Sequence, residues 1–282
     1  MSHTLDSAAS SWLPVPAVPA DALVDARLQL HHAAQVANSP AISYLAPSPD
    51  DSHTNFGWSP DLRAFVSQRV ELPRARRFAW RPIDLALLSL DDGDAVVSAF
   101  GLAGHTLADA HAWARGECEA AGADAAGYTR LKHYEIPSHA VASGAPFSVS
   151  AAASTALSLL WSNASTFLDA AANLSTHASS VRLWPHHFDL GLLDAIDDTR
   201  SIGAGFSPGD HYYLEPYFYL SPYPRPVVAR RPSLDGGAHW HEDEFFSAVL
   251  PWRTFVAARS PGTAVAAYFR SAIEGARSLL GA

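Results

Sequence analysis

Apolar residues recur at helical spacing in four parts of the chain. This spacing predicts amphipathic helices at about 23–37, 106–121, 151–175 and 262–280. Pro40 is expected to end the first helix, because proline supplies no backbone donor in a helix interior. In the second, Thr106 followed by Asp109 three residues later predicts an N-terminal capping box. On the third helix, Trp161 is expected to be buried against a sheet.

Shorter apolar segments with strand character lie between these helices, and they occur in both halves of the chain. The order helix, strands, helix therefore appears twice, and "GWSPDL" shares its Trp, Pro, Asp and Leu with "LWPHHFDL". We predict an α+β fold of two similar halves, each a mainly antiparallel sheet flanked by helices, and infer an internal duplication. The expected organisation is a flexible lead-in at 1–20, an N-terminal half at 21–141, a linker at 142–150 and a C-terminal half at 151–282.

Composition excludes several function classes. The formal net charge is −9 and the densest basic run is "RARR", so the positive surface that a nucleic-acid partner requires is not expected. The sequence has no run of eighteen apolar residues, so we expect no membrane span. The N-terminus lacks the pattern of a secretory signal, and we therefore expect a cytoplasmic protein. A single lysine among 19 basic residues indicates GC-rich codons and a bacterial source. The sequence leaves the oligomeric state open.

The single cysteine, Cys118, excludes an intramolecular disulfide and any metal site built from several cysteines. Its place on the inner stripe of the second predicted helix favours a core residue over a nucleophile.

The stretch "VRLWPHHFDLGLL", residues 181–193, combines strand character with two adjacent histidines and an aspartate. In one unbroken strand, alternate side chains share a face, which would place His187 beside Asp189. A His-x-Asp pair with a distant histidine is one way of encoding a two-histidine, one-carboxylate metal site. "HWHEDE" offers His239 or His241 as that histidine. The alternative is that these side chains only hydrogen-bond the backbone around them.

A second interpretation of the C-terminal half is a small-molecule pocket lined by histidine, tyrosine and tryptophan. The candidate lining residues are Trp184, His186, Glu215, Tyr217, Tyr219 and Trp240. Trp184 is also expected to be buried, and the tyrosines could instead cover an edge of the core.

No nucleophile elbow, phosphate loop or zinc-protease motif is present. The sequence therefore favours binding of a small molecule without chemistry. The alternative is a metal-dependent oxygenase or hydrolase that holds a divalent iron or zinc ion through His187, Asp189, His239 and His241. Whether the protein is an enzyme stays open.

Several segments together resemble a bacterial protein family of unknown function. They are "LQLHHAAQVANS", "DDSHTNFGW", the "WPHHFDL" strand, "GFSPGD", "EPYFYLSPYP" and the final "LPW". The resemblance covers roughly residues 22–280 and is most specific in the second half. It supports the α+β architecture and implies no catalytic residue.

Overall fold

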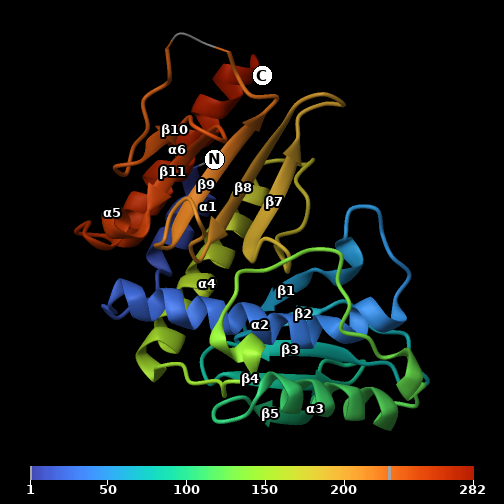
Figure 1. Cartoon of the computed structure of the whole chain (residues 1–282). Coiled ribbons are helices and arrows are strands. Elements are labelled where there is room, and N and C mark those ends of the chain that lie inside the picture. Colours follow the sequence, from blue (N-terminus) through green and yellow to red (C-terminus); the bar gives the residue numbers. More distant parts are fainter. Residues whose placement is uncertain (1, 228–229) are drawn as a thin grey trace. The chain divides into compact units, whose positions relative to one another are not determined.

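The computed structural model describes residues 2–227 and 230–282, and the chain forms two compact units (Figure 1). The N-terminal unit comprises Val15–Ser158 and Arg182–Phe188. The C-terminal unit comprises Met1–Pro14, Leu159–Val181 and Asp189–Ala282. This division differs from the predicted halves, because the first residues of the chain belong with the C-terminal unit. Helix α4 (Ala151–Ala172) contributes residues to both units.

The N-terminal unit contains antiparallel strands in the order β6-β1-β2-β3-β4-β5. Their bounds are β1 (Phe56–Ser59), β2 (Ala64–Ser67), β3 (Arg77–Arg81), β4 (Ala86–Leu90), β5 (Val96–Gly101) and β6 (Arg182–Trp184). Helices α2 (Ala20–Tyr44) and α3 (Leu107–Ala120) lie side by side and both contact this sheet (Figure 1). The unit also has three short 3₁₀ turns. One lies between α2 and β1, and two lie between α3 and α4: η1 (Ser52–Thr54), η2 (Ala125–Gly127) and η3 (Ala140–Ser143).

Helix α2 continues through Pro40 to Tyr44, so the prediction that Pro40 ends it is wrong. Proline removes one backbone donor, but the last turn gains burial instead: Pro40 is buried and Ala41 is 1% exposed. The hydroxyl of Ser39 donates to the Gln35 carbonyl at 2.9 Å, and that of Ser43 donates to the Ser39 carbonyl at 2.6 Å. Such hydroxyl bonds to the preceding turn accompany bent helices.

Helix α3 begins as predicted. The Thr106 hydroxyl accepts from the Asp109 amide, and the Asp109 carboxylate accepts from the Thr106 amide, which is a complete capping box. Its inner face buries Ala110, Ala114 and Cys118.

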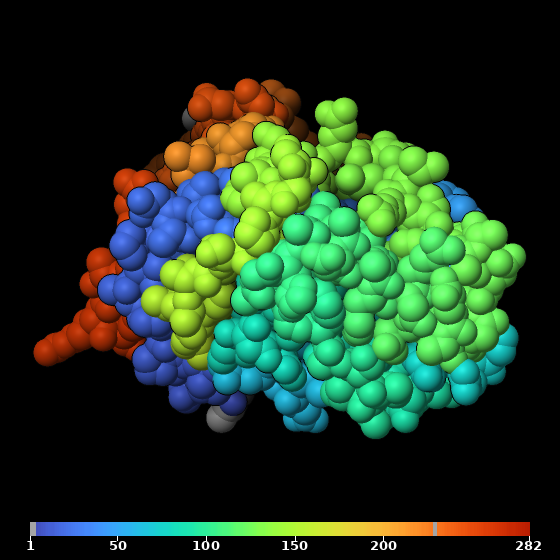
Figure 2. All heavy atoms as spheres, turned by 60° about the horizontal axis from the view of Figure 1, so that its bottom comes forward, coloured from blue at the N-terminus to red at the C-terminus, as the bar shows by residue number. Residues whose placement is uncertain are grey.

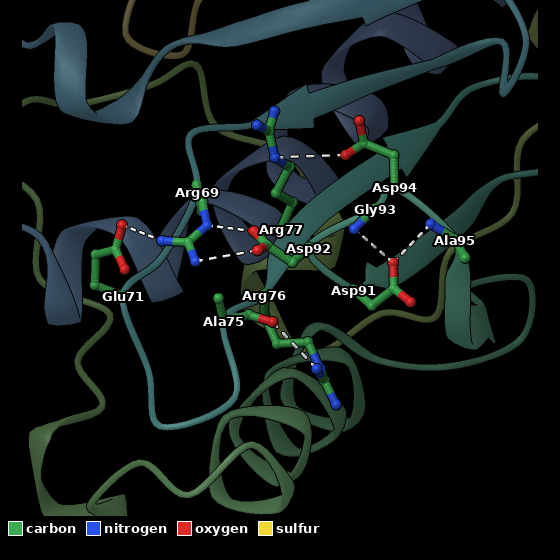
Figure 3. Close-up of polar contacts among 10 residues, drawn as sticks. All are labelled: Arg69, Glu71, Ala75, Arg76, Arg77, Asp91, Asp92, Gly93, Asp94 and Ala95. Carbon is green, nitrogen blue, oxygen red and sulfur yellow. Dashed lines mark hydrogen bonds and ion pairs between the residues drawn. The ribbon is translucent and has the colours of Figure 1, made fainter.

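The turn between β4 and β5 is held by Asp91, whose Oδ1 accepts from the amides of Gly93 and Ala95 at 2.9 Å each (Figure 3). The residue with positive φ is Asp94, at 63°, and not the glycine. Aspartate tolerates this conformation better than most residues, because its short polar side chain bonds locally. Arg77 lies opposite Asp94, with 3.4 Å between its Nε and a carboxylate oxygen.

The C-terminal unit has antiparallel strands in the order β10-β11-β9-β8-β7. Their bounds are β7 (Asp189–Ala195), β8 (Ser201–Ser207), β9 (Tyr217–Tyr223), β10 (His239–His241) and β11 (Ser247–Pro251). The helices α5 (Trp252–Val256) and α6 (Pro261–Leu280) follow β11. Helix α6 begins at proline and buries Val265, Phe269 and Ile273 along one face.

The predicted lead-in at 1–20 contains a helix within its described residues. Ser2–Ser10 form helix α1, in which Leu5 and Ala8 are buried. Gly262 of α6 approaches this segment closely, since a Cβ there would lie 2.6 Å from the Ala9 carbonyl oxygen. Alanine-rich composition suits a packed helix as well as a linker.

The α+β class and the antiparallel pairing are confirmed. The duplication is not confirmed, since the two units arrange their strands in different orders. Trp161 is fully buried, as predicted, whereas Trp184 is only half-buried. Among the helices of residues 2–227 and 230–282, none is long and apolar enough to cross a membrane.

Candidate functional site

The segment 181–193 does not form one strand. Strand β6 ends at Trp184, a turn occupies residues 185–188, and β7 begins at Asp189. The Phe188 amide closes the turn on the Trp184 carbonyl at 2.7 Å, and Phe188 has a positive φ of 60°. The prediction of an unbroken strand is therefore wrong, because proline and this left-handed residue redirect the chain. The alternation that placed His187 and Asp189 on one face no longer applies.

This turn is fastened to helix α2 inside the N-terminal unit. The Pro185 carbonyl accepts from His31 Nε2 at 2.7 Å and from Gln35 Nε2 at 3.0 Å. The Phe188 ring stacks on the His31 imidazole, with ring centres 4.4 Å apart. Burial lowers the pKa of His31 to about 3, so a neutral imidazole makes these contacts at neutral pH. The centre of the "WPHHFD" stretch thus anchors a turn.

The two adjacent histidines of the turn differ in environment. His186 is half-buried between aromatic rings, with centroids 5.6 Å from Tyr134 and 6.0 Å from Trp184. Its Nδ1 is buried and has no hydrogen-bond partner among the residues that the structure describes. Burial and the neighbouring His187 lower its pKa. His187 is exposed.

In the C-terminal unit, Tyr219 of β9 extends across its neighbours and donates its hydroxyl hydrogen bond to Asp189. Gly205 of β8 lies directly opposite Tyr219, and Gly191 of β7 lies opposite Gly205. A Cβ at Gly205 would overlap the phenol and lie 2.6 Å from the Leu190 carbonyl oxygen. The two glycines therefore form a slot for the ring. Burial and the Asp189 charge raise the pKa of Tyr219 well above its usual range.

A second group of polar contacts lies near the start of β9. Tyr217 donates to Asp210 at 2.5 Å, and the other oxygen of Asp210 accepts from the amides of Tyr212 and Tyr213. The Tyr213 hydroxyl lies 2.9 Å from His239 Nε2 and 3.0 Å from His241 Nδ1. The two predicted histidine ligands of β10 therefore meet at one phenol.

Glu215 and Trp240 have structural partners. Glu215 accepts from the Arg253 amide at 2.8 Å, in the first turn of α5, and forms an ion pair with that guanidinium. The Trp240 indole donates to the Pro232 carbonyl at 2.8 Å and stacks on Phe246. These contacts support loop and helix ends.

Of the four predicted metal ligands, His239 and His241 converge on the hydroxyl of Tyr213. His187 belongs to the N-terminal unit, whereas Asp189, His239 and His241 belong to the C-terminal unit. Within the described parts of the chain, no three His, Cys, Asp or Glu side chains gather where they could hold a metal ion. His239 and His241 are therefore the two predicted ligands that lie close to a common group.

A different polar arrangement lies on helix α2. His32, Gln35, Ser39 and Ser43 recur at spacings of three and four residues, which places them on one helix face. His32 Nε2 donates to the Pro137 carbonyl at 3.2 Å, and Gln35 Oε1 accepts from the Tyr134 hydroxyl at 2.8 Å. Ser43 accepts from the Thr129 amide at 2.9 Å. This polar stripe therefore pins the loop 128–137 along the helix.

Two adjoining cavities lie beside the polar stripe, both within the N-terminal unit. The inner cavity, of about 170 Å³, is lined by His32, Gln35, Ser39, Ile42, Leu107, His111, Arg130 and Lys132. The outer one, of about 430 Å³, is lined by His111, Ala112, Arg115, Gly116, Glu119, Tyr128 and Arg130. Because His111 and Arg130 line both, we treat the two as one candidate site, the α2–α3 cavity. The segment that follows α3 (green) lies at the surface of the unit (Figure 2).

The histidines of the α2–α3 cavity are neutral at physiological pH. Burial, together with the positive charges of Arg130 and Lys132, lowers the pKa of His111 to about 4. Burial also lowers the pKa of His32. His111 Nδ1 lies 2.9 Å from the Tyr128 hydroxyl, and burial raises the pKa of that phenol. The cavity thus offers neutral imidazoles as hydrogen-bonding groups beside permanent cations.

Sequence reasoning missed the α2–α3 cavity. The available signal was the polar stripe itself, because four polar residues on one face of a largely buried helix require buried partners. Arg130 and Lys132 carried no such signal, since they lie in a segment without periodicity.

A family of unknown function (DUF5996) matches residues 194–281 of the chain. The matched segment lies in the C-terminal unit, from the end of β7 to the end of α6. No curated protein and no solved structure matches the chain. The α2–α3 cavity lies outside the matched segment.

Proposed function

We propose that this protein binds a small molecule in the α2–α3 cavity. The observation that supports this is the cavity itself, in which a wider outer space of about 430 Å³ adjoins an inner one of about 170 Å³. Small-molecule sites typically span about 300–1,000 Å³ and combine apolar walls with a few polar groups. Leu107, Ile42 and Ala112 supply apolar surface here, and the histidines and cations supply polar atoms.

This proposal keeps the binding function that the sequence favoured and moves it from the C-terminal to the N-terminal unit. The tyrosines Tyr217 and Tyr219 already donate to carboxylates of their own unit. Glu215 and Trp240 are likewise engaged in local contacts. Side chains with satisfied hydrogen bonds gain less from a ligand than groups that face an open cavity.

A fragment screen by protein-observed NMR on the full chain tests the proposal. We expect fragments to shift amide signals of α2, α3 and the loop 128–137. Ala112→Trp should fill the outer cavity and weaken fragment binding at least about tenfold, since the site loses its volume. Ala108→Trp is the matched control, because Ala108 is exposed on the same helix and does not line the cavity. Equal binding by both variants would contradict the proposal.

Metal binding is the second candidate function, and its support is the convergence of His239 and His241 on Tyr213. Two imidazoles and a phenol could ligate zinc or iron with water in the remaining positions. Titration of tag-free protein with Zn²⁺ by calorimetry tests this, with the His239→Gln, His241→Gln double variant as comparison. Equal zinc uptake by both proteins would remove this candidate.

A further inference from the structure

Arg130 and Lys132 stand apart from the other cations around the α2–α3 cavity. Neither side chain forms a hydrogen bond or ion pair with any residue that the structure describes. Arg115, which also lines the outer cavity, is paired with Glu119 at 2.9 Å. Elsewhere, several arginines of this acidic chain face carboxylates, as Arg69 faces Asp92 and Arg77 faces Asp94 (Figure 3).

The inner cavity has two cations and no carboxylate in its lining. Its polar lining is completed by neutral groups: the imidazoles of His32 and His111, the Gln35 amide and the Ser39 hydroxyl. Glu119, the acidic residue of the outer cavity, is neutralised by Arg115. The potential inside the cavity is therefore positive, although the whole chain carries a formal charge of −9.

The loop that carries both cations is held in place by several bonds. Thr129 is bonded to Ser43 of α2, and the Leu131 amide donates to the Thr129 hydroxyl at 3.1 Å. Tyr134 is bonded to Gln35 and to Asn38, the latter at 3.3 Å. Because the loop backbone is fixed before binding, less ordering entropy is lost when a ligand arrives.

We infer that the α2–α3 cavity takes an anionic ligand, with a carboxylate or phosphate group held by Arg130 and Lys132 and a small apolar part against Leu107 and Ile42. This inference rests on the proposed function and adds the chemical class of the ligand. Arginine binds such oxyanions through paired N–H groups, and lysine binds them as a compact charge. The inner volume of about 170 Å³ matches a group of about the size of benzene, which fills cavities of about 150 Å³.

Calorimetry on the full chain at low ionic strength tests the inference with three probes of one shape: benzoate, phenyl phosphate and the neutral benzyl alcohol. We expect one or both anions to bind more tightly than the alcohol, and the stronger anion identifies the preferred group. Arg130→Gln and Lys132→Gln should each weaken anion binding about tenfold, because a hydrogen bond to a charged group is lost. Added salt should weaken anion binding and leave alcohol binding unchanged.

Arg259→Gln is the matched control, since it removes the same charge from an exposed position in the C-terminal unit. Both cavity cations are exposed, so their variants should unfold at the temperature of the parent. Anion binding that is equal in the parent and in the Arg130→Gln, Lys132→Gln double variant overturns the inference. Binding of benzyl alcohol alone, abolished by Ala112→Trp, overturns the anionic class and retains the proposed function. If none of the three probes binds and no fragment binds, the inference and the proposed function are both contradicted.

Discussion

Tyr219 occupies the space that a side chain at Gly205 would need. The two residues are cross-strand partners on β9 and β8, and the phenol reaches over the glycine to Asp189. Strand glycines usually weaken a sheet through their entropy and lack of packing. Here the glycine is what allows a half-buried tyrosine to lie across the sheet surface.

Gly205→Ala should therefore destabilise the protein by about 1–3 kcal/mol or more, the range for overpacking a filled space. Gly203→Ala on the same strand is the control, because its Cβ would meet nothing closer than 4.0 Å. Urea unfolding followed by tryptophan fluorescence measures both. Similar stability of the two variants would mean that the ring of Tyr219 moves aside freely.

The capping box of α3 gives a second prediction. Thr106→Ala removes the hydroxyl that accepts from the Asp109 amide, and loss of an N-cap typically costs about 1 kcal/mol. Thr166→Ala provides the comparison, since Thr166 is an exposed helical threonine whose hydroxyl bonds the preceding turn. Thermal unfolding should separate the two. A Thr166 variant as unstable as the Thr106 variant would show that the cap contributes nothing particular.

Stability should depend on pH through the buried histidines. Burial holds the pKa of His111 at about 4 and that of His31 at about 3, below the usual value of 6.5. The unfolded chain therefore binds more protons than the folded chain below pH 6.5, and stability falls as the pH drops from there towards 4. Each histidine can contribute a slope of up to about 1.4 kcal/mol per pH unit in this window.

Denaturant unfolding between pH 7.5 and 4.5 measures that slope. His111→Gln should reduce it, because the variant lacks the buried imidazole. An identical slope in the His111 variant would show that this imidazole is accessible to protons in the folded protein.

The two tryptophans that the sequence placed in the core should differ in their effects. Trp161 is fully buried, and truncation to alanine should cost about 3–5 kcal/mol. Trp184 is half-buried beside His186, so its truncation should cost clearly less. Denaturant unfolding of the two alanine variants tests this order. A larger loss at Trp184 would indicate that the turn after β6 supports more of the fold than its exposure suggests.

Helices and their faces were predictable from the sequence because a helix carries its period within about twenty residues. The burial of Trp161 and the box at Thr106 and Asp109 both appear as expected. The failures arise where tertiary burial outweighs a local preference. Pro40 stays helical because its turn is buried, and Ser2–Ser10 pack as a helix although their composition suits a linker.

The candidate site was less predictable, because its residues are collected from distant segments. His32, His111 and Lys132 come from two helices and a loop, and nothing local relates them. The His-x-Asp pattern was local and misled, since Pro185 and the positive φ of Phe188 break the strand that the pattern assumed. The helical spacing of the polar stripe on α2 could be recognised in the sequence. The loop that this stripe contacts could not be predicted from it.

The sole thiol of the chain has a practical consequence. Cys118 lies on the inner face of α3, and burial raises its pKa to about 12. A thiol that is both shielded and protonated reacts with alkylating or disulfide reagents only when the helix detaches from its neighbours. The rate at which Cys118 is modified therefore reports how often α3 opens. This helix forms one wall of the α2–α3 cavity. A ligand that bridges α2 and α3 would lower the rate of Cys118 modification as its occupancy rises. The measurement uses the natural cysteine, so no cysteine has to be introduced.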